Sequence, residues 1–323
     1  MAAYFRNYQT RADLDRAYDV ERSVPNFRIY ADQWVDGSAQ ARRHLGGKLG
    51  VKYGPTVEEY ADIFPAGRRG APVLIFIHGG YWRMLSAREF SFVALGPVAA
   101  GVTTVVANYA LCPSVSISEI VRQMRALVAW TYSNIEAFNG DPESIHVCGH
   151  SAGGHLTAMM ALTDWAKAYG LPANVLKSAF PISGLFELEP LRHSWLQPDL
   201  QLDEREVATQ SPQRLVRRVS PPMLLSYGSE EPSAFAQQSD NFLAGWKRAG
   251  NRASFMPLIG RNHFTAISDF ADPQSLFCRE LFQMMQHSPS RSLSSGGMTA
   301  HERPTAAVSL PTSGYGPSVR GGH

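Results

Sequence analysis

The residues best suited to chemistry stand together in positions 145–155. An apolar run leads into Gly149, Ser151 and Gly153, which form the pattern Gly-x-Ser-x-Gly, and a helix-forming segment follows. A serine on a sharp turn between a strand and a helix holds its Oγ clear of the sheet, where it can attack a carbonyl carbon. The N–H of Ala152, at the start of that helix, points into the same space and can bind a developing negative charge. The stretch therefore predicts a serine nucleophile at Ser151.

A serine nucleophile needs a base that takes its proton and an acid that orients the base. His263 follows the last predicted strand, 253–259, after a glycine turn, and is the candidate base. The strand before it, 221–228, is followed by two carboxylates. The acid usually stands three residues after the glycine that ends this strand, which selects Glu231 and leaves Glu230 as the alternative. The acid would hold His263 in the tautomer whose Nε2 faces the serine.

A third group, the oxyanion hole, is expected in the loop after an early strand. Residues 78–82 read His-Gly-Gly-Tyr-Trp and follow an unbroken apolar run directly. Glycines let the backbone come close to a substrate and turn its N–H groups inward. We expect the N–H groups of Gly80 and Tyr81, together with that of Ala152, to bind the oxyanion. The histidine at the start of the loop is expected to anchor it.

The elements that must position these groups alternate between strands and helices. Apolar or β-branched runs predict strands, and segments with helical spacing of apolar residues lie between them. The predicted strands are 73–77, 102–107, 145–149, 176–182, 221–228 and 253–259, and the predicted helices are 87–100, 118–138, 235–249 and 265–286. This alternation predicts an α/β fold with a mostly parallel central sheet that helices cover on both faces.

Four segments make up the predicted organisation. Residues 1–70 form an N-terminal segment expected to pack on the core and the lid, and residues 71–287 form the core. Within the core, residues 184–215 form a long, acidic segment that contains several prolines. We expect this segment to be a partial lid over the end of the sheet that carries the active site. Residues 288–323 are rich in Ser, Gly, Pro and Thr and lack the apolar residues that offset ordering entropy, which predicts a disordered tail.

Composition excludes several classes of partner. The 323 residues include 30 basic and 28 acidic side chains, a net charge of +2 that favours neither nucleic acid nor an anionic membrane. Three widely spaced cysteines form neither a disulfide framework nor a metal-binding pattern, and no metal or organic cofactor is expected. The N-terminus lacks the apolar core of a signal peptide, and no apolar run is long enough to span a membrane. These features predict a cytoplasmic protein.

Two motifs together resemble a known family. Residues 78–82 and 149–155 are similar to those of the arylformamidase (kynurenine formamidase) branch of the α/β-hydrolases. This branch carries His-Gly-Gly-x-Trp where lipase-like carboxylesterases usually carry His-Gly-Gly-Gly. Residues 181–191, 235–239 and 262–264 also resemble the family, and the resemblance runs from about residue 25 to residue 286. One departure is the acid position, where animal members usually have aspartate.

The resemblance implies a reaction and a substrate class. It implies hydrolysis of N-formyl-L-kynurenine to formate and L-kynurenine, a step of tryptophan catabolism, on an α/β-hydrolase fold without a cofactor. The partner would be a small aromatic amide or ester. Four aromatic residues on the motif loops or the expected lid are candidates to hold the aromatic leaving group: Trp82, Phe186, Trp195 and Phe264.

The residues leave other functions open. The same machinery would serve a general carboxylesterase or arylamidase, because only the pocket would differ. A hydrolase-fold protein that binds a ligand without turnover is a third reading, although such proteins generally lose a triad member and here all three positions are filled. The sequence leaves open whether two copies associate as a homodimer.

Overall fold

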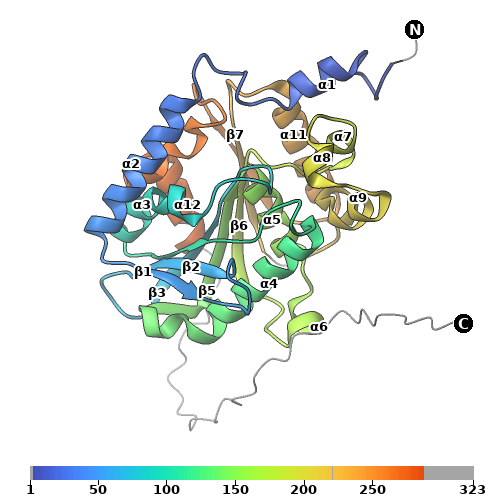
Figure 1. Ribbon diagram of the computed structural model, residues 1–323. Helices are drawn as coiled ribbons and strands as arrows, with labels where there is room; N and C mark the ends of the chain where they lie inside the picture. The colour runs from blue at the N-terminus through green and yellow to red at the C-terminus, as the bar shows by residue number, and fades with distance from the viewer. Residues whose placement is uncertain (1–2, 220, 287–323) are drawn as a thin grey trace, which may run out of the picture. The chain divides into compact units, whose positions relative to one another are not determined.

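The computed structural model describes residues 3–219 and 221–286, and a central sheet dominates them (Figure 1). Within these residues the sheet has eight strands in the order β1-β2-β4-β3-β5-β6-β7-β8. Strand β2 runs antiparallel to β1 and β4, and all other neighbours are parallel. The strands are β1 (Lys48–Lys52), β2 (Tyr60–Phe64), β3 (Ala71–Ile77), β4 (Thr103–Ala107), β5 (Gly140–His150), β6 (Leu176–Ile182), β7 (Met223–Gly228) and β8 (Ala253–Leu258).

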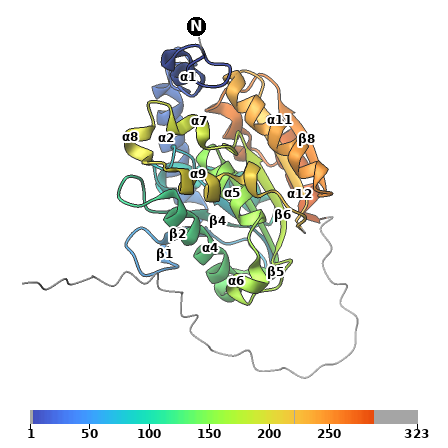
Figure 2. The same cartoon turned by 90° about the vertical axis from the view of Figure 1, so that its right-hand side faces the viewer.

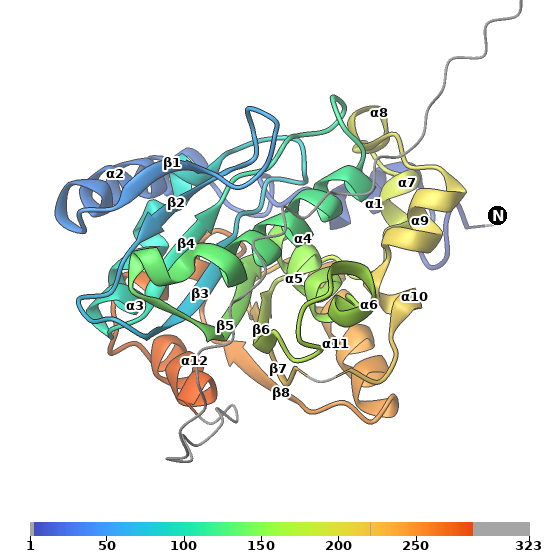
Figure 3. The same ribbon diagram turned by 90° about the horizontal axis from the view of Figure 1, so that it is seen from below.

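Helices cover both faces of the sheet, as Figure 3 shows for α3 and α12 on one side and α4 and α5 on the other. One face carries α2 (Arg28–His44), η1 (Ala87–Ala94), α3 (Leu95–Ala99), η3 (Thr265–Ala271) and α12 (Leu276–Gln286). The other carries α4 (Ile117–Asn134), α5 (Ala152–Ala161) and α11 (Ser233–Arg248), and the short elements η2 (Ile135–Phe138) and α6 (Trp165–Tyr169) follow α4 and α5. The predicted fold class is therefore confirmed.

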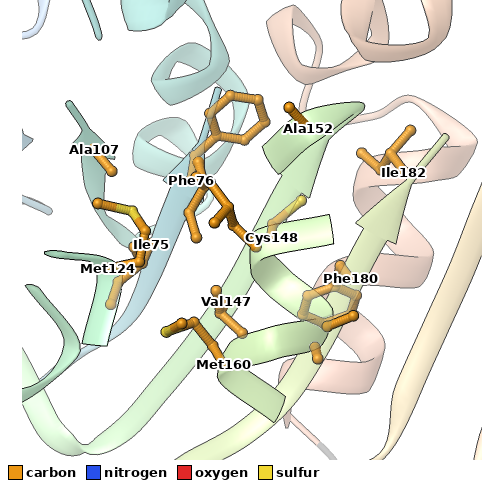
Figure 4. Packing of buried hydrophobic residues seen from close by; sticks show 14 of the residues in the cluster. Ile75, Phe76, Ala107, Met124, Val147, Cys148, Ala152, Met160, Phe180 and Ile182 are labelled. Carbon is orange, nitrogen blue, oxygen red and sulfur yellow. The ribbon is translucent and has the colours of Figure 1, made fainter. Parts of the chain in front are cut away.

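Helices bury the central strands on both sides, and apolar runs such as residues 73–77 in β3 suit that environment. Side chains of β3, β5 and β6 interlock in the middle of the sheet (Figure 4). Ile75, Phe76, Val147, Cys148 and Phe180 are all fully buried there. This packing holds the carboxyl ends of the three strands in fixed positions, and the functional loops leave from those ends.

Three predicted helices are divided in the structure. The segment 87–100 is a 3-10 helix that passes into the short helix α3, the segment 118–138 is divided between α4 and η2, and the segment 265–286 is divided between η3 and α12. Pro273 lies in the last of these breaks, where the restricted backbone before a proline disfavours helix. A capping box at Ser86 and Glu89 begins η1, so its start follows from local chemistry.

The N-terminal segment lies beside residues 184–215, as Figure 2 shows for α1 (Arg11–Ala17) and α7 (Glu189–Arg192). The Tyr4 hydroxyl donates to the carbonyl of His193 at 3.0 Å, and the backbone N–H of Trp195 donates to the Asp15 carboxylate at 2.7 Å. Residues 184–215 contain four short helices: α7 (Glu189–Arg192), α8 (Gln197–Leu200), α9 (Glu204–Gln210) and α10 (Pro212–Leu215).

Two further predictions concern the C-terminal tail and membrane-spanning segments. The tail predicted at residues 288–323 lies outside the described residues. Among residues 3–219 and 221–286, no helix is both long enough and apolar enough to cross a membrane.

Candidate active site

Ser151 stands on the tight turn between β5 and α5. Its backbone has φ 57° and ψ −118°, a conformation that side-chain-bearing residues rarely adopt and that costs on the order of 1–3 kcal/mol. A Cβ at Gly149 would overlap the carbonyl of Gly153, and a Cβ at Gly153 would overlap the carbonyl of Ile77. Both glycines are therefore required for strand and helix to approach closely enough to form this turn.

The structure joins Ser151, His263 and Glu231 in one line of hydrogen bonds. His263 Nε2 lies 3.0 Å from Ser151 Oγ, and His263 Nδ1 lies 2.7 Å from Glu231 Oε2. Only 4% of the His263 side chain and 1% of the Glu231 side chain are exposed. The contact between these two side chains is thus shielded from water, and electrostatic interactions are stronger in such surroundings than in water.

Two further donors fix the carboxylate of Glu231. Its Oε1 accepts from the Ser183 hydroxyl at 2.5 Å and from the Gly228 N–H at 2.7 Å, which leaves Oε2 to face His263. Glu230, the other candidate acid, is exposed. Ser183 follows β6 and was not singled out in the sequence, because a lone serine after a strand carries no recognisable signal.

The loop 78–82 lies against the serine turn. A Cβ at Gly79 would come within 3.1 Å of the Ser151 Cβ, so the backbone reaches the nucleophile closely. Gly80 and Tyr81 have positive φ values of 107° and 49°. Within the described part of the chain, the N–H groups of Gly80, Tyr81 and Ala152 have no hydrogen-bond acceptor. These amides are available to a ligand, and Gly80 and Tyr81 line the same pocket as Ser151.

Two buried histidines flank the site and are neutral near pH 7. Burial lowers the pKa of His78 to about 4, and its ring stacks on Tyr109 with centroids 4.1 Å apart. Burial, reinforced by the neighbouring His263, holds the pKa of His150 well below its usual range. A neutral His150 adds no positive charge beside the imidazole of His263, whose ring centroid lies 4.6 Å away.

A pocket opens over Ser151 and His263. Of the four aromatic residues expected to bind substrate, Trp195 and Phe264 line it. Trp82 instead packs edge-on against His155, and Phe186 stacks on Phe242 with centroids 4.2 Å apart; neither lines the pocket, and both are fully buried. The prediction that Trp82 and Phe186 contact the substrate is therefore wrong, and both side chains pack in the core instead.

Other pocket residues escaped the sequence reasoning because distant segments supply them. The N-terminal segment contributes Asp19, Val20, Glu21 and Trp34, and the loop after residue 82 contributes Arg83, Met84 and Leu85. No local pattern marks these residues as neighbours of Ser151. Only the folded chain shows that hydrophobic and charged residues of the N-terminal segment form part of the pocket wall.

The fold and the site define a class of protein. A mostly parallel eight-stranded sheet within the described residues, with a serine on the strand–helix turn and a histidine after the last strand, is that of an α/β-hydrolase. Residues 62–245, more than half of the chain, match the family BD-FAE. The chain belongs to the BD-FAE family, in an arylformamidase-like branch of the α/β-hydrolases.

Known proteins similar to this chain are hydrolases. The kynurenine formamidase of Danio rerio is 26% identical over 289 residues, which cover 85% of this chain and 97% of that protein. Esterase LipQ of Mycobacterium tuberculosis is 29% identical, with 65% of this chain and 55% of LipQ covered. A solved structure from Silicibacter sp. TM1040, provisionally described as a thioesterase, has a TM-score of 0.75 and 28% identity, with 82% and 97% covered. The chain is thus a hydrolase of the α/β family that acts on esters or amides.

Proposed function

We propose that this chain hydrolyses the formamide of an aryl amine, with N-formyl-L-kynurenine as its substrate and formate and L-kynurenine as products. The observation that carries the proposal is the hydrogen-bonded line from Ser151 through His263 to Glu231, at the base of a pocket with aromatic walls. The similarity to the kynurenine formamidase of Danio rerio over 85% of the chain supports this choice of substrate. The reaction would be a step of tryptophan catabolism.

The first half of the reaction forms an ester on the serine. Ser151 Oγ attacks the formyl carbon while His263 Nε2 takes the hydroxyl proton, and Glu231 stabilises the resulting imidazolium. The negative charge develops on the formyl oxygen. The N–H groups of Gly80, Tyr81 and Ala152 bind that oxygen, and each well-placed donor contributes roughly 10²–10³ to the rate.

The second half releases the products. Protonated His263 gives its proton to the aniline nitrogen, the C–N bond breaks, and the amine leaves the formyl-serine. A water molecule then loses a proton to His263 and attacks the formyl carbon, so that formate is released and Ser151 Oγ recovers its proton. Residues 184–215 act as a partial lid, since Trp195 comes from them, and the N-terminal segment closes another side through Val20 and Glu21.

A second candidate function is that of a carboxylesterase acting on another ester. The similarity to esterase LipQ favours it, and it would use the same triad and oxyanion hole. The third reading, a binding protein without turnover, is disfavoured because a hydrogen-bonded serine, histidine and carboxylate are all present.

The test compares two substrates on the purified chain, N-formyl-L-kynurenine and p-nitrophenyl acetate, with Ser151→Ala as the control. Formamide turnover that the substitution abolishes is the expected result. Ester turnover alone would move the function to that of a carboxylesterase. Failure of both reactions, with a serine that does not react with an organophosphate, would favour the binding protein.

A further inference from the structure

Three buried nitrogen atoms in the pocket wall have no hydrogen-bond partner among the described residues. They are Arg83 Nε, His150 Nε2 and Trp195 Nε1, and all three residues line the pocket over Ser151. Buried polar atoms without a partner are uncommon, because each costs about 1–3 kcal/mol of lost hydration. Because all three nitrogen atoms lie in the wall of one pocket, a polar ligand bound there could supply their missing hydrogen-bond partners.

Arg83 and Trp195 form one unit at the less buried end of this pocket. The guanidinium carbon of Arg83 lies 5.1 Å from the Trp195 ring centroid, and Arg83 Nη1 donates to Asp199 at 3.0 Å. These contacts fix the plane of the guanidinium while its Nε and Nη2 edge has no acceptor in the described residues. The Nε and Nη2 edge of arginine matches the two oxygens of a carboxylate.

Acidic residues line the same pocket. Asp19 is paired with Arg22 at 3.1 Å, whereas the exposed carboxylate of Glu21 has no ion pair within the described residues. The Arg83 side chain is 24% exposed, while Ser151 is 3% exposed. Arg83 and Glu21 are thus more exposed than Ser151 within one pocket lining. Arg83 is paired with Asp199 through Nη1 but keeps an unpartnered Nε, and Glu21 has no ion pair within the described residues.

We infer that the open end of the pocket is a subsite for a zwitterionic α-amino acid group. The carboxylate accepts hydrogen bonds from Arg83 and from the Trp195 indole N–H, and the ammonium group pairs with Glu21. This subsite rests on the proposed function. Its residues would select an amino acid derivative over a plain aryl formamide.

Three substrates separate the contributions. N-formyl-L-kynurenine carries both charges, its des-amino analogue 4-(2-formamidophenyl)-4-oxobutanoate carries only the carboxylate, and 2′-formamidoacetophenone carries neither. All three present the same formanilide and ketone to Ser151. Each is assayed for kcat and KM with the full chain and its variants, and p-nitrophenyl acetate turnover reports whether the triad is intact.

Arg83→Gln is expected to lower kcat/KM for the two acids by about 10- to 100-fold, mainly through KM, because hydrogen bonds to a charged group are lost. The losses with the neutral ketone and with p-nitrophenyl acetate should be several-fold smaller than those with the two acids. Arg83→Lys should restore only part of kcat/KM for the acids, since lysine keeps the positive charge but lacks the planar guanidinium that donates two parallel hydrogen bonds to a carboxylate. Arg205→Gln removes the same charge from an exposed position of α9 and is the matched control.

Glu21→Gln tests the ammonium contact separately. The group is exposed, so the expected loss is only about two- to fivefold. It should appear with N-formyl-L-kynurenine and not with the des-amino acid or the ketone.

Two results would overturn the subsite. Equal losses on the acids and the ketone in Arg83→Gln would mean that Arg83 acts structurally through Asp199. No loss on the acids would mean that another group binds the carboxylate.

Failure of the proposed function is distinguishable from failure of the subsite. If the wild-type chain cleaves p-nitrophenyl acetate but none of the formamides, the formamidase function is wrong. The subsite is then tested with phenyl acetate and 3-acetoxybenzoate. A preference for the anionic ester that disappears in Arg83→Gln would support the carboxylate site, and the absence of any preference would overturn it.

Discussion

At the scale of single residues, Ser151 combines an unfavourable backbone with a reactive position. The positive φ is imposed by the contact between β5 and α5, which the N–H of Ser151 reinforces by donating to the Ile182 carbonyl at 2.9 Å. The strain stays because the surrounding packing over-determines it. The turn thus costs stability while it holds the Ser151 side chain within hydrogen-bond distance of His263.

This strain can be measured by replacing the serine. Ser151→Ala and Ser151→Gly should both lower kcat by on the order of 10⁴-fold or more. Glycine adopts positive φ without a steric cost, so Ser151→Gly should be more stable than Ser151→Ala by about 1 kcal/mol in urea unfolding. Equal or lower stability of the glycine variant would contradict a strained turn.

Substitutions of the two adjacent glutamates test which of them is the proposed triad acid. Glu231→Gln preserves shape but removes the charge that stabilises the His263 imidazolium, so kcat should fall about 10³- to 10⁴-fold. Glu230→Gln is the matched control and should leave kcat within about twofold, because Glu230 is exposed. The opposite pattern in a steady-state assay would reassign the acid to Glu230.

At the scale of elements, the junction of β3, β5 and α5 sets the geometry of the site. Gly153 lies in the first turn of α5 directly against the end of β3, and Gly154 faces β6 and its following loop. The absence of side chains brings the helix N-terminus close to the carboxyl ends of the strands. The Ala152 N–H then lies next to Ser151, the proposed nucleophile, in the positive field of the helix dipole.

A methyl group at this junction should be costly. Gly153→Ala would drive a Cβ into the carbonyl oxygen of Ile77, and we expect a loss of roughly 3 kcal/mol or more in the free energy of unfolding, together with lost activity. Gly67→Ala is the control, because no atom lies within 4 Å of its added Cβ and its φ is not positive. Thermal unfolding of both variants measures the difference, and similar melting temperatures would show that α5 can shift.

At the scale of the whole molecule, buried histidines couple folding to pH. Burial, and to a smaller extent Lys177, lowers the pKa of His146 to about 3, and burial lowers that of His155 to about 4. In the unfolded chain a histidine titrates near about 6.5. Below that pH the unfolded chain binds the additional protons, so the free energy of unfolding falls as the pH drops from about 6.5 toward these folded-state values.

Replacement of one such histidine should flatten this dependence. His146 lies on β5 and pairs with the Ser178 hydroxyl at 2.5 Å. His146→Gln should reduce the slope of unfolding free energy against pH between 6 and 4.5 by about one proton, or ~1.4 kcal/mol per pH unit. Urea titrations at several pH values measure the slope, with His44→Gln on the exposed end of α2 as control. An unchanged slope would show that His146 is protonated in the folded chain.

The motifs were readable from sequence because their signals are local. The serine turn needs glycines on both sides of Ser151, the oxyanion loop follows a fully apolar strand, and His263 follows the last strand after a glycine. Alternation of buried strands with amphipathic helices likewise determined the class of fold. Helix ends were less predictable: the predicted helix 265–286 runs through Pro273, although the backbone restriction before that proline is a local signal for the break.

The sequence by itself determined which residues are chemically able to act and the order of the elements that carry them, because strand, turn and helix propensities act over a few residues. The tertiary structure decided which side chains meet. It placed Glu231, and not the exposed Glu230, beside His263, and it added the Ser183 hydroxyl to the partners of that carboxylate. It buried Trp82 and Phe186 in the core and brought Glu21 and Arg83 to one pocket. These outcomes depend on contacts between residues far apart in the chain, and packing alone determines such contacts.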